Sequence, residues 1–509
     1  MNDRRAKAWA KLAAHPRQTL AELFSDDARV TRLSDRLELP AGGILFDWSK
    51  THLSPGLLEA FEELAEAAGF DQARADLYAG EAVNRSENRP AEHLAQRGFG
   101  KDASVEEAGS LHLRMRMLTE AIHEGAMGDV RHLIHIGIGG SALGPALAVD
   151  ALTRDLAPEA GYGVDVHVVS NVDGCALEQA FRACDPATTL VAVASKTFTT
   201  IETITNAQSA LKWMADHGVA DPMGRVVALT ASPEAAVEWG VDETRILPFP
   251  HTVGGRYSLW SSIGFPVALA LGWEEFAAML EGAAMMDRHF LETDGAANLP
   301  LRAAFADQLY TRLRGCQSRG VFAYDERLRL FPSYLQQLEM ESNGKGVMAD
   351  GAPLDGPTAP VTWGGVGTDA QHAVFQLLHQ GTAEVPVDFI ASIAPGDGLD
   401  PAHHRILLMN CLAQGAALMA GRNNEDPARA YPGNRPSATI LCDDFDAGTL
   451  GALIAFHEHR TFANAVLMGI NPFDQFGVEL GKDIARGIEE GGVAFDAGTS
   501  ALLLAAGMG

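Results

Sequence analysis

The sequence is poor in cysteine, and its few cysteines form no recognisable framework. The five are scattered along 509 residues: Cys175, Cys184, Cys316, Cys411 and Cys442. Their number is odd, and they show neither a CxxC pair nor a Cys/His spacing of the kind found in zinc sites. This usage excludes a disulfide framework, argues against a metal site and is typical of a reducing compartment. We therefore expect a cytoplasmic protein without a metal.

Long hydrophobic runs are also missing. The longest apolar stretches, Phe265–Leu271 and Ala501–Ala506, are far shorter than the about 20 residues that span a membrane. The stretch Met1–Leu20 contains several charges and no apolar core, so it does not resemble a secretory signal. We expect no membrane partner.

Basic side chains are scarce relative to acidic ones. The sequence has 39 Lys and Arg against 66 Asp and Glu, a net charge of −27. The negative electrostatic field of such a charge disfavours nucleic acid and anionic membrane surfaces as partners. It also repels a phosphorylated ligand, but salt screens that repulsion beyond about 8 Å, so donors inside a pocket can still bind one.

The remaining composition is that of a globular protein, with 47% hydrophobic and 21% charged residues. Up to about residue 128 the apolar residues follow a helical period, with one short strand expected within Ile44–Lys50. From Arg131 onward, short β-branched runs alternate with helical segments, which predicts parallel sheets with helices on both faces. The expected strands are His132–Ile136, Val164–Val169, Leu190–Ala194, Val226–Leu229, Gly320–Tyr324, Val361–Trp363, Val385–Ile390 and Ala438–Cys442.

We therefore predict an α/β fold with two three-layer domains, each built on a central parallel sheet. The expected boundaries are a helical N-terminal segment at 1–128, a first α/β domain at 129–285, a second at 286–485, and a C-terminal helix or tail at 486–509.

The stretch Thr188–Asn206 carries the clearest sign of a binding site. A buried strand runs directly into Ser195-Lys196-Thr197-Phe198-Thr199-Thr200, and a helical pattern follows. The first N–H groups of a helix have no partner within the helix, and its dipole favours an anion there. Lys196 opposes that dipole unless an anion lies beside it. The alternative is a Ser/Thr N-cap with a solvated lysine.

A glycine turn lies in the segment HLIHIGIGGSALGP, residues 132–145. Its Gly137-x-Gly139-x-x-Ala142 spacing matches a dinucleotide fingerprint, and Asp173 after the next strand could serve as the ribose-binding acid. However, Ser141 follows the glycines, and a second hydroxyl loop lies two strands on. Two hydroxyl loops at strand ends suit one small phosphate better than a dinucleotide.

Three further segments supply candidate catalytic groups. Arg256, in the turn TVGGRYS, could bind phosphate or stabilise an oxyanion, or could bond only local carbonyls. Gln337 and Glu341 share a face near a helix C-terminus, where the dipole makes a carboxylate bind a proton more readily, as a general base requires. The same turn could instead hold solvated carboxylates, as we expect for Glu339.

Two helix starts complete the inventory. Thr368 and Gln371 fit a capping box that would place His372 in a first helical turn, where neutral imidazole is favoured. We expect His379, on the same face, to be structural. Gln475 and Lys482 fall on one stripe of the last strong helix, which a solvated amphipathic surface would explain equally well.

Taken in order, these stretches resemble the phosphoglucose isomerase family. The matching motifs are Asp47-x-Ser-Lys50, Asn84–Arg97, IGIGGSALGP, SKTFTT-x-ET-x-TN, GGRYS, QQ-x-x-MESNGK, GT-x-AQHA and FDQFGVELGK. They span nearly the whole chain, and GGRYS and FDQFGVELGK are highly specific. The resemblance implies two sugar-isomerase-type (SIS) domains, a homodimer with shared active sites and no cofactor. It implies reversible conversion of glucose 6-phosphate to fructose 6-phosphate, in glycolysis and gluconeogenesis.

The resemblance also assigns roles by position. Glu341 matches the base that moves a proton between C2 and C1 through a cis-enediol(ate), and Arg256 the group that stabilises this intermediate. His372, reaching over from the other subunit, and Lys482 match the pair that opens the sugar ring. The residues that match phosphate or substrate contacts are Gly140, Ser141, Ser195, Lys196, Thr197, Thr200, Gln337 and Gln475. Asp369 and Leu338-Glu339 depart from common variants, and the short apolar tail leaves open how the C-terminus contacts a partner.

Two alternative functions remain besides that of a dinucleotide-binding enzyme. A relative that also accepts mannose 6-phosphate would use the same base. A sugar-phosphate sensor without activity could keep the fold, although the joint presence of Glu341, His372 and Lys482 argues against it.

Overall fold

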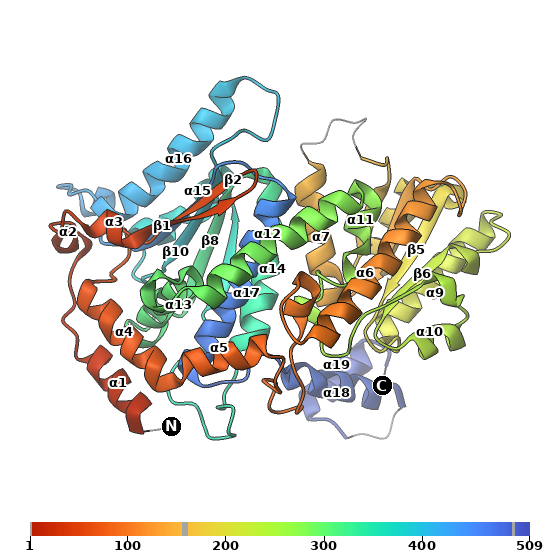
Figure 1. Cartoon of the computed structure of the whole chain (residues 1–509), viewed down its shortest axis with the longest axis horizontal. Helices are drawn as coiled ribbons and strands as arrows, with labels where there is room; N and C mark the ends of the chain where they lie inside the picture. Colours follow the sequence, from red (N-terminus) through yellow and green to blue (C-terminus); the bar gives the residue numbers. More distant parts are fainter. Residues whose placement is uncertain (1–2, 155–160, 491–493, 509) are drawn as a thin grey trace. The chain divides into compact units, whose positions relative to one another are not determined.

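The structure is a computed structural model that describes residues 3–154, 161–490 and 494–508 (Figure 1). The chain forms two compact units, Met1–Pro472 and Phe473–Gly509. Among the described residues, no helix has both the length and the apolar character needed to cross a bilayer.

The first sheet has five parallel strands in the order β4-β3-β5-β6-β7. They are β3 (His132–Gly137), β4 (Asp165–Val169), β5 (Thr189–Ala194), β6 (Val226–Thr230) and β7 (Ile246–Pro248). Every residue of β5 and β6 is buried, as continuous apolar runs predict for strands covered on both faces. The four strands predicted here are confirmed. β7, only three residues long, gives too short a pattern to detect.

Helices cover both faces of this sheet (Figure 1). The first layer packs on the face that includes Ile134 and Val191, and consists of α8 (Gly174–Ala183), α9 (Ile201–Asp216) and α10 (Pro233–Trp239). The opposite layer consists of α6 (Asp102–His123), α7 (Gly140–Thr153) and α11 (Phe265–Leu271).

The second sheet has six strands in the order β1-β2-β11-β10-β8-β9. Its parallel part comprises β8 (Ser318–Tyr324), β9 (Val361–Val366), β10 (Val387–Ser392) and β11 (Ser437–Cys442). An antiparallel hairpin, β1 (Ser34–Leu39) and β2 (Gly42–Asp47), extends it along β11. The N-terminal segment therefore supplies two strands where one was expected. β1 was missed because its sequence, SDRLEL, is half charged.

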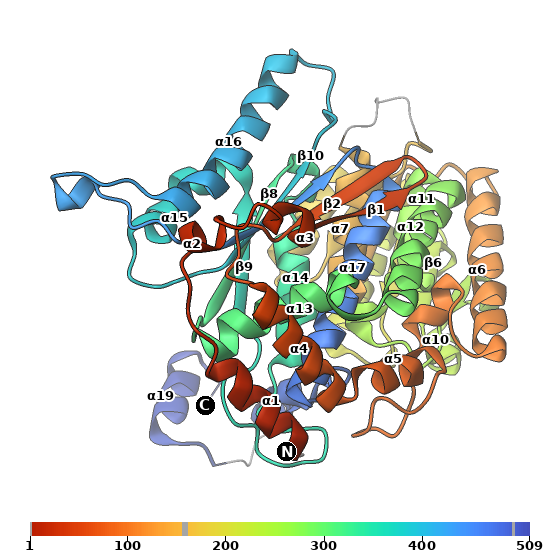
Figure 2. The same cartoon turned by 60° about the vertical axis from the view of Figure 1, so that its left-hand side comes forward.

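The second sheet is also covered on both faces (Figures 1 and 2). On one face, α15 (Gly367–Gln380) and α16 (Pro401–Ala420) pack on Phe322 and Phe389. On the other face lie α12 (Trp273–Glu292), α13 (Leu299–Gln308), α14 (Phe331–Asn343) and α17 (Ala447–Met468). The N-terminal helices α1 (Asp3–Ala13), α4 (Pro55–Ala68) and α5 (Phe70–Tyr78) lie outside this helical layer, with α4 and α5 packed against α17. The short helices α2 (Leu20–Leu23) and α3 (Arg29–Leu33) come just before the β1–β2 hairpin in the chain.

Buried ion pairs join the N-terminal segment to the central helices. Arg97, at the end of the 3₁₀ helix His93–Arg97, bonds Asp287 of α12 at 2.7 Å and Glu458 of α17 at 2.6 Å. All three side chains are fully buried. Breaking such a pair strands an uncompensated charge, at a cost of about 3–5 kcal/mol. The polar motif Asn84–Arg97 thus has a structural role at Arg97.

The second unit contains a 3₁₀ turn (Phe476–Val478), α18 (Glu479–Glu490) and α19 (Ala497–Ala505). Gln475 is the residue before the 3₁₀ turn, and Lys482 lies in the first turn of α18.

Candidate active site

The carboxyl ends of β3 and β5 form the centre of the candidate site. The two strands are neighbours, with Gly137 paired to Ala194, so the turns that follow them lie side by side. The chain leaves β3 toward β4 on one side and β5 toward β6 on the other. A parallel sheet opens a crevice for ligands where its strand order reverses in this way. The glycine turn and the hydroxyl loop, Ser195–Thr200, follow these two strand ends.

The hydroxyl loop is held by its own side chains. Ser195 Oγ and Thr200 Oγ1 are 3.1 Å apart, and Thr197 Oγ1 lies 2.8 Å from Thr199 Oγ1. Phe198 is buried against the core and has a φ of 56°, a region that bulky residues seldom adopt. Thr200 occupies the N-cap position of α9, as the alternative interpretation expects of a Ser/Thr cap, but its side chain makes no capping hydrogen bond. The first N–H groups of α9 keep their capacity to bind an anion.

Lys196 is not the solvated lysine of the alternative reading. Its ammonium donates to the carbonyl oxygens of His251 at 2.6 Å and Val253 at 2.9 Å, and the side chain is partly buried. Burial, together with the nearby Arg89, lowers the pKa of Lys196 to about 8. Lys196 therefore joins the hydroxyl loop to the segment that leads into the GGRYS turn.

The GGRYS turn packs directly on the glycine turn. A Cβ atom on Gly140 would lie 2.1 Å from the carbonyl carbon and oxygen of Gly255 and 2.5 Å from the backbone nitrogen of Arg256. Only glycine allows two backbones to approach this closely. The contact holds Arg256, whose side chain is buried, beside the ends of β3 and β5.

Arg256 in turn contacts the C-terminal end of α14. Its Nε donates to Ser342 Oγ at 2.6 Å, and its Nη2 donates to the carbonyl oxygen of Pro472. Its Nη1 lies 3.7 Å from Oε2 of Glu341. Because that separation is longer than a hydrogen bond, other partners hold the guanidinium while the carboxylate stays available.

Glu341 has the environment expected of a reactive carboxylate. Its Oε2 is buried and accepts no hydrogen bond from the described part of the chain. The side chain as a whole is 18% exposed, so a ligand can reach it. A buried acceptor without a donor is costly, and a ligand hydroxyl would supply one. Glu341 thus faces the same site as Arg256.

Gln337, one helical turn earlier, also faces the glycine turn. A Cβ atom on Gly139 would lie 3.0 Å from Gln337 Nε2. Glu339, in contrast, is not the solvated carboxylate that we expected. It is buried, accepting hydrogen bonds from Asn343 and Thr461 at 3.1 Å each. Helical spacing places it correctly on another face, but α17 covers that face.

Ser342 is a positioning residue that sequence reasoning missed. It is fully buried, accepts the bond from Arg256, and lies 3.0 Å from the Tyr257 hydroxyl. The only signal in the sequence was its place inside the marked motif QQ-x-x-MESNGK, directly after Glu341. Ser342 fixes the arginine relative to the neighbouring Glu341.

His372 lies elsewhere in the same chain. It is exposed on α15, across the second sheet from α14, and lines an open cavity of about 510 Å³ with Gln371, His379 and Arg422. The predicted capping box is wrong: β9 runs straight into α15 with Val366 as N-cap and no side-chain cap. Gln371 instead bonds Tyr324 and Asn410, and His379 bonds Gln414, in keeping with its expected structural role.

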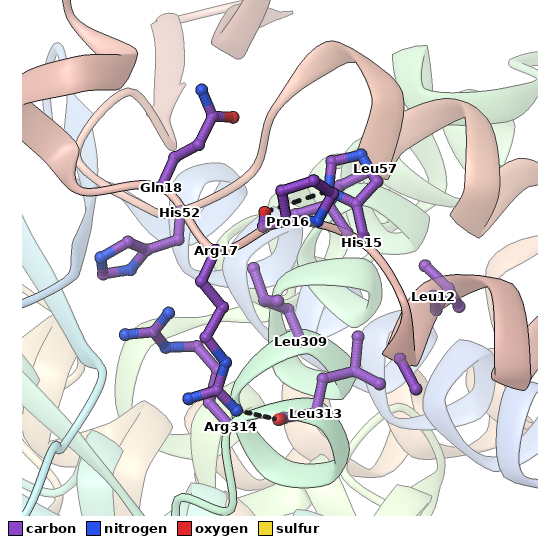
Figure 3. Close-up of a pocket in the computed structure, with 11 residues that line it drawn as sticks. Leu12, His15, Pro16, Arg17, Gln18, His52, Leu57, Leu309, Leu313 and Arg314 are labelled. Atoms are coloured by element: carbon purple, nitrogen blue, oxygen red, sulfur yellow. Dashed lines mark hydrogen bonds between the residues drawn. The ribbon is translucent and has the colours of Figure 1, made fainter.

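A separate small pocket lies between the N-terminal segment and the turn that ends at Leu313 (Figure 3). It has about 50 Å³ of space, enough for only a few waters. Of the two arginines that line it, Arg17 donates to the carbonyl of Leu313, and Arg314 binds Glu384 through two bonds of 2.9 Å. The predicted site residues do not line this pocket.

Comparisons with known proteins find relatives along nearly the whole chain. The family model described as "Phosphoglucose isomerase" matches residues 47–503. A glucose-6-phosphate isomerase of Erythrobacter litoralis is 70% identical over 100% of both chains, and one of Novosphingobium aromaticivorans is 69% identical over 98% of both. A crystal structure of a glucose-6-phosphate isomerase from Chlamydia trachomatis has a TM-score of 0.89 at 30% identity, covering 100% of this chain and 99% of that one.

Proposed function

This chain belongs to the phosphoglucose isomerase family, and we propose that Glu341 carries the proton in its reaction. That reaction is the interconversion of glucose 6-phosphate and fructose 6-phosphate, a step of glycolysis and gluconeogenesis. The observation that carries the proposal is the pair of Glu341 and Arg256, with 3.7 Å between Oε2 and Nη1 and no donor among the described residues bonded to that oxygen.

The proposed chemistry begins with the open-chain sugar. Glu341 removes the proton from C2 of glucose 6-phosphate and returns it to C1, while the hydroxyl proton on O2 is lost and one is gained on O1. Negative charge develops on oxygen in the enediol(ate) between these steps. Arg256, held by Ser342, lies where its charge would stabilise that oxygen. The protein needs no hydride carrier for this exchange.

The phosphate would bind at the carboxyl ends of β3 and β5. Ser195, Thr197 and Thr200 offer hydroxyls, and Lys196 adds charge and backbone donors. Gly140 and Ser141, which begin α7, would complete the cradle. Gln337, beside Gly139, is proposed to contact the sugar, as is Gln475.

Ring opening is assigned to His372 and Lys482. His372 lies across the second sheet from Glu341 within one chain, which supports a homodimer whose active site receives His372 of the partner subunit. A shared site would also explain why an exposed histidine lines an open cavity on α15. No membrane or nucleic acid enters this proposal, and we place the reaction in the cytoplasm.

The proposed domain organisation remains that predicted from the sequence: 1–128, two SIS-type domains at 129–285 and 286–485, and 486–509. The seam at 285/286 falls within α12, which packs along α17. We therefore expect the two α/β domains to resist separation by proteolysis at that point.

Replacing the carboxylate tests the proposal. Glu341→Gln keeps the shape of the side chain but cannot accept a proton, so kcat should fall by at least about 10²-fold while sugar-phosphate affinity is kept. Steady-state rates in both directions, with affinity measured by ligand titration, give the two quantities.

Glu339→Gln is the matched control, because Glu339 lies on the same helix and faces α17 instead. Its kcat should remain within a few-fold of the original, roughly the effect of a change outside the site. A Glu341→Gln enzyme as fast as this control would remove Glu341 as the base.

A further inference from the structure

Three side chains able to bind a metal converge at the amino-terminal edge of the first sheet. His132 begins β3, His167 lies in β4, and Cys184 caps the C-terminus of α8. One donor atom from each lies within 4.8 Å of the other two. The register of β3 and β4 explains the meeting: Ile134 pairs with His167, so His132 and His167 point to the same face, the one that α8 covers.

One ring nitrogen of each histidine is left without a partner among the described residues. His132 Nδ1 and His167 Nε2 are buried and have no hydrogen-bond partner in the described part of the chain. Buried polar atoms are nearly always paired, so two unpaired imidazole nitrogens beside a buried thiol require an explanation. The centroids of the two imidazole rings lie 6.2 Å apart, which is too far for a hydrogen bond between the rings.

We infer that His132, His167 and Cys184 bind one transition-metal ion of the Zn²⁺ type. Imidazole nitrogen and thiolate sulfur are the ligands that Zn²⁺ prefers, and three of them with a water complete a tetrahedron. Bond lengths of about 2.0 Å to nitrogen and 2.3 Å to sulfur would bring the donors about 3.3–3.6 Å apart. The side chains must therefore approach by roughly 1 Å, a movement that side-chain rotation can supply.

The surroundings favour a cation. Asp165, on β4 two residues before His167, lies close enough to act electrostatically on both His167 and Cys184. The thiol loses its proton when it binds such an ion. The ion would tie β3, β4 and the end of α8 together, and so stabilise the first sheet.

This site is separate from the reaction centre. β3 spans His132–Gly137, so the cluster lies at the opposite end of the strand from the glycine turn, about 17 Å away at 3.3 Å per residue. The inference therefore stands independently of the proposed function. Spacing in the sequence could not reveal it, because the three ligands come from separate elements, and the sequence alone argued against zinc.

The test uses the full-length enzyme, freed of metal and dialysed against micromolar Zn²⁺. We expect one ion per chain by elemental analysis, and at least about tenfold weaker binding in Cys184→Ser and in His167→Gln. Cys175→Ser is the matched control: Cys175 is an exposed cysteine on the same helix, so this variant should bind as the original does. Equal binding by all four proteins, or no binding by the original, would overturn the inference.

Cobalt provides a second readout that needs no variant of the cluster. Co²⁺ added to the original protein and to Cys175→Ser should give a thiolate-to-cobalt absorption band in both; its absence would overturn the inference even if the other variants fail to fold. Zn²⁺ should also raise the melting temperature of the original enzyme but not that of Cys184→Ser. Isomerase activity at low temperature should survive a chelator, which separates failure at this cluster from failure at Glu341.

Discussion

The two central side chains of the site, Arg256 and Glu341, differ in how firmly the structure holds them. Arg256 is buried and fixed by Ser342 and the Pro472 carbonyl, so it contributes charge at a constant position. Glu341 has one oxygen that bonds no donor in the described chain, so it is ready for a ligand. A rigid cation beside an available carboxylate is the arrangement that proton transfer next to a developing oxyanion requires.

Lys196 gives a pH dependence that can be measured. Burial lowers the pKa of its ammonium to about 8, so the free enzyme loses this charge as the pH rises through that value. A phosphate dianion binds the charged form better, and KM should therefore rise above about pH 8 while kcat changes less. Charged hydrogen bonds of about 1.5–3 kcal/mol correspond to a rise in KM of about 10–100-fold when the charge is fully lost.

Lys196→Arg is the matched variant for this experiment, because arginine stays protonated throughout. Its KM should be flat between pH 7 and 9, whatever its absolute value. The same rise in KM above pH 8 in both proteins would assign that rise to another group.

The pKa of Lys196 also affects the free energy of unfolding. Because its pKa is lower in the folded protein, the unfolded chain binds more protons between about pH 8 and 10.5. This group therefore stabilises the fold increasingly as the pH rises through that window.

Single residues were predictable where one motif marked them. The sequence identified the hydroxyl loop, Arg256 and Glu341, and the structure brings Arg256 to Glu341. The sequence did not identify Ser342. It also predicted that Glu339 is solvated, whereas Glu339 is buried against α17, which lies more than a hundred residues away in the chain. Which residues of a site contact one another depends on tertiary packing, and local sequence patterns carry no information about that packing.

Among the elements, the glycine turn before α7 is the most constrained. It must accept the GGRYS turn at a distance that excludes a side chain, and it begins the helix beside the proposed phosphate. Sequence periodicity located the parallel strands of both sheets except the short β7, because buried β-branched runs are a strong local signal. The β1–β2 hairpin was only half predicted, since a charged edge strand carries little of that signal.

Gly140→Ala tests this contact. The new methyl would overlap the backbone of Gly255, so the two turns must separate and Arg256 must move. A displacement of about 1 Å at a catalytic group costs on the order of 10²-fold, and we expect kcat/KM to fall by at least that factor.

Gly109→Ala is the control for this change, because a Cβ atom there meets nothing within 4 Å on α6. It should keep full activity, with a melting temperature that is unchanged or slightly raised. Normal activity in Gly140→Ala would mean that the close approach of the two turns does not position Arg256.

At the scale of the whole molecule, the placement of His372 decides what one chain can do alone. Within a chain the second sheet separates α15 from α14, so in the proposed homodimer the site would be complete only when two chains combine. An acidic protein with a net charge of −27 can form such a dimer because screening confines repulsion to short range.

Hybrid dimers test this arrangement. Neither Glu341→Gln nor His372→Ala should be active alone. When equal amounts of the two variants are mixed, dissociated and reassociated at random, half of the dimers are hybrids. In each hybrid, one of the two sites has both residues intact. About a quarter of the original activity should therefore return. If each chain used its own His372, the mixture would stay inactive.

The most direct test of the account follows hydrogen itself. The enzyme should incorporate deuterium from D₂O at C2 of glucose 6-phosphate and C1 of fructose 6-phosphate, and Glu341→Gln should lose this exchange by at least about 10²-fold while still binding the sugar phosphates. Exchange at the original rate in Glu341→Gln would contradict the assignment of Glu341 as the proton carrier.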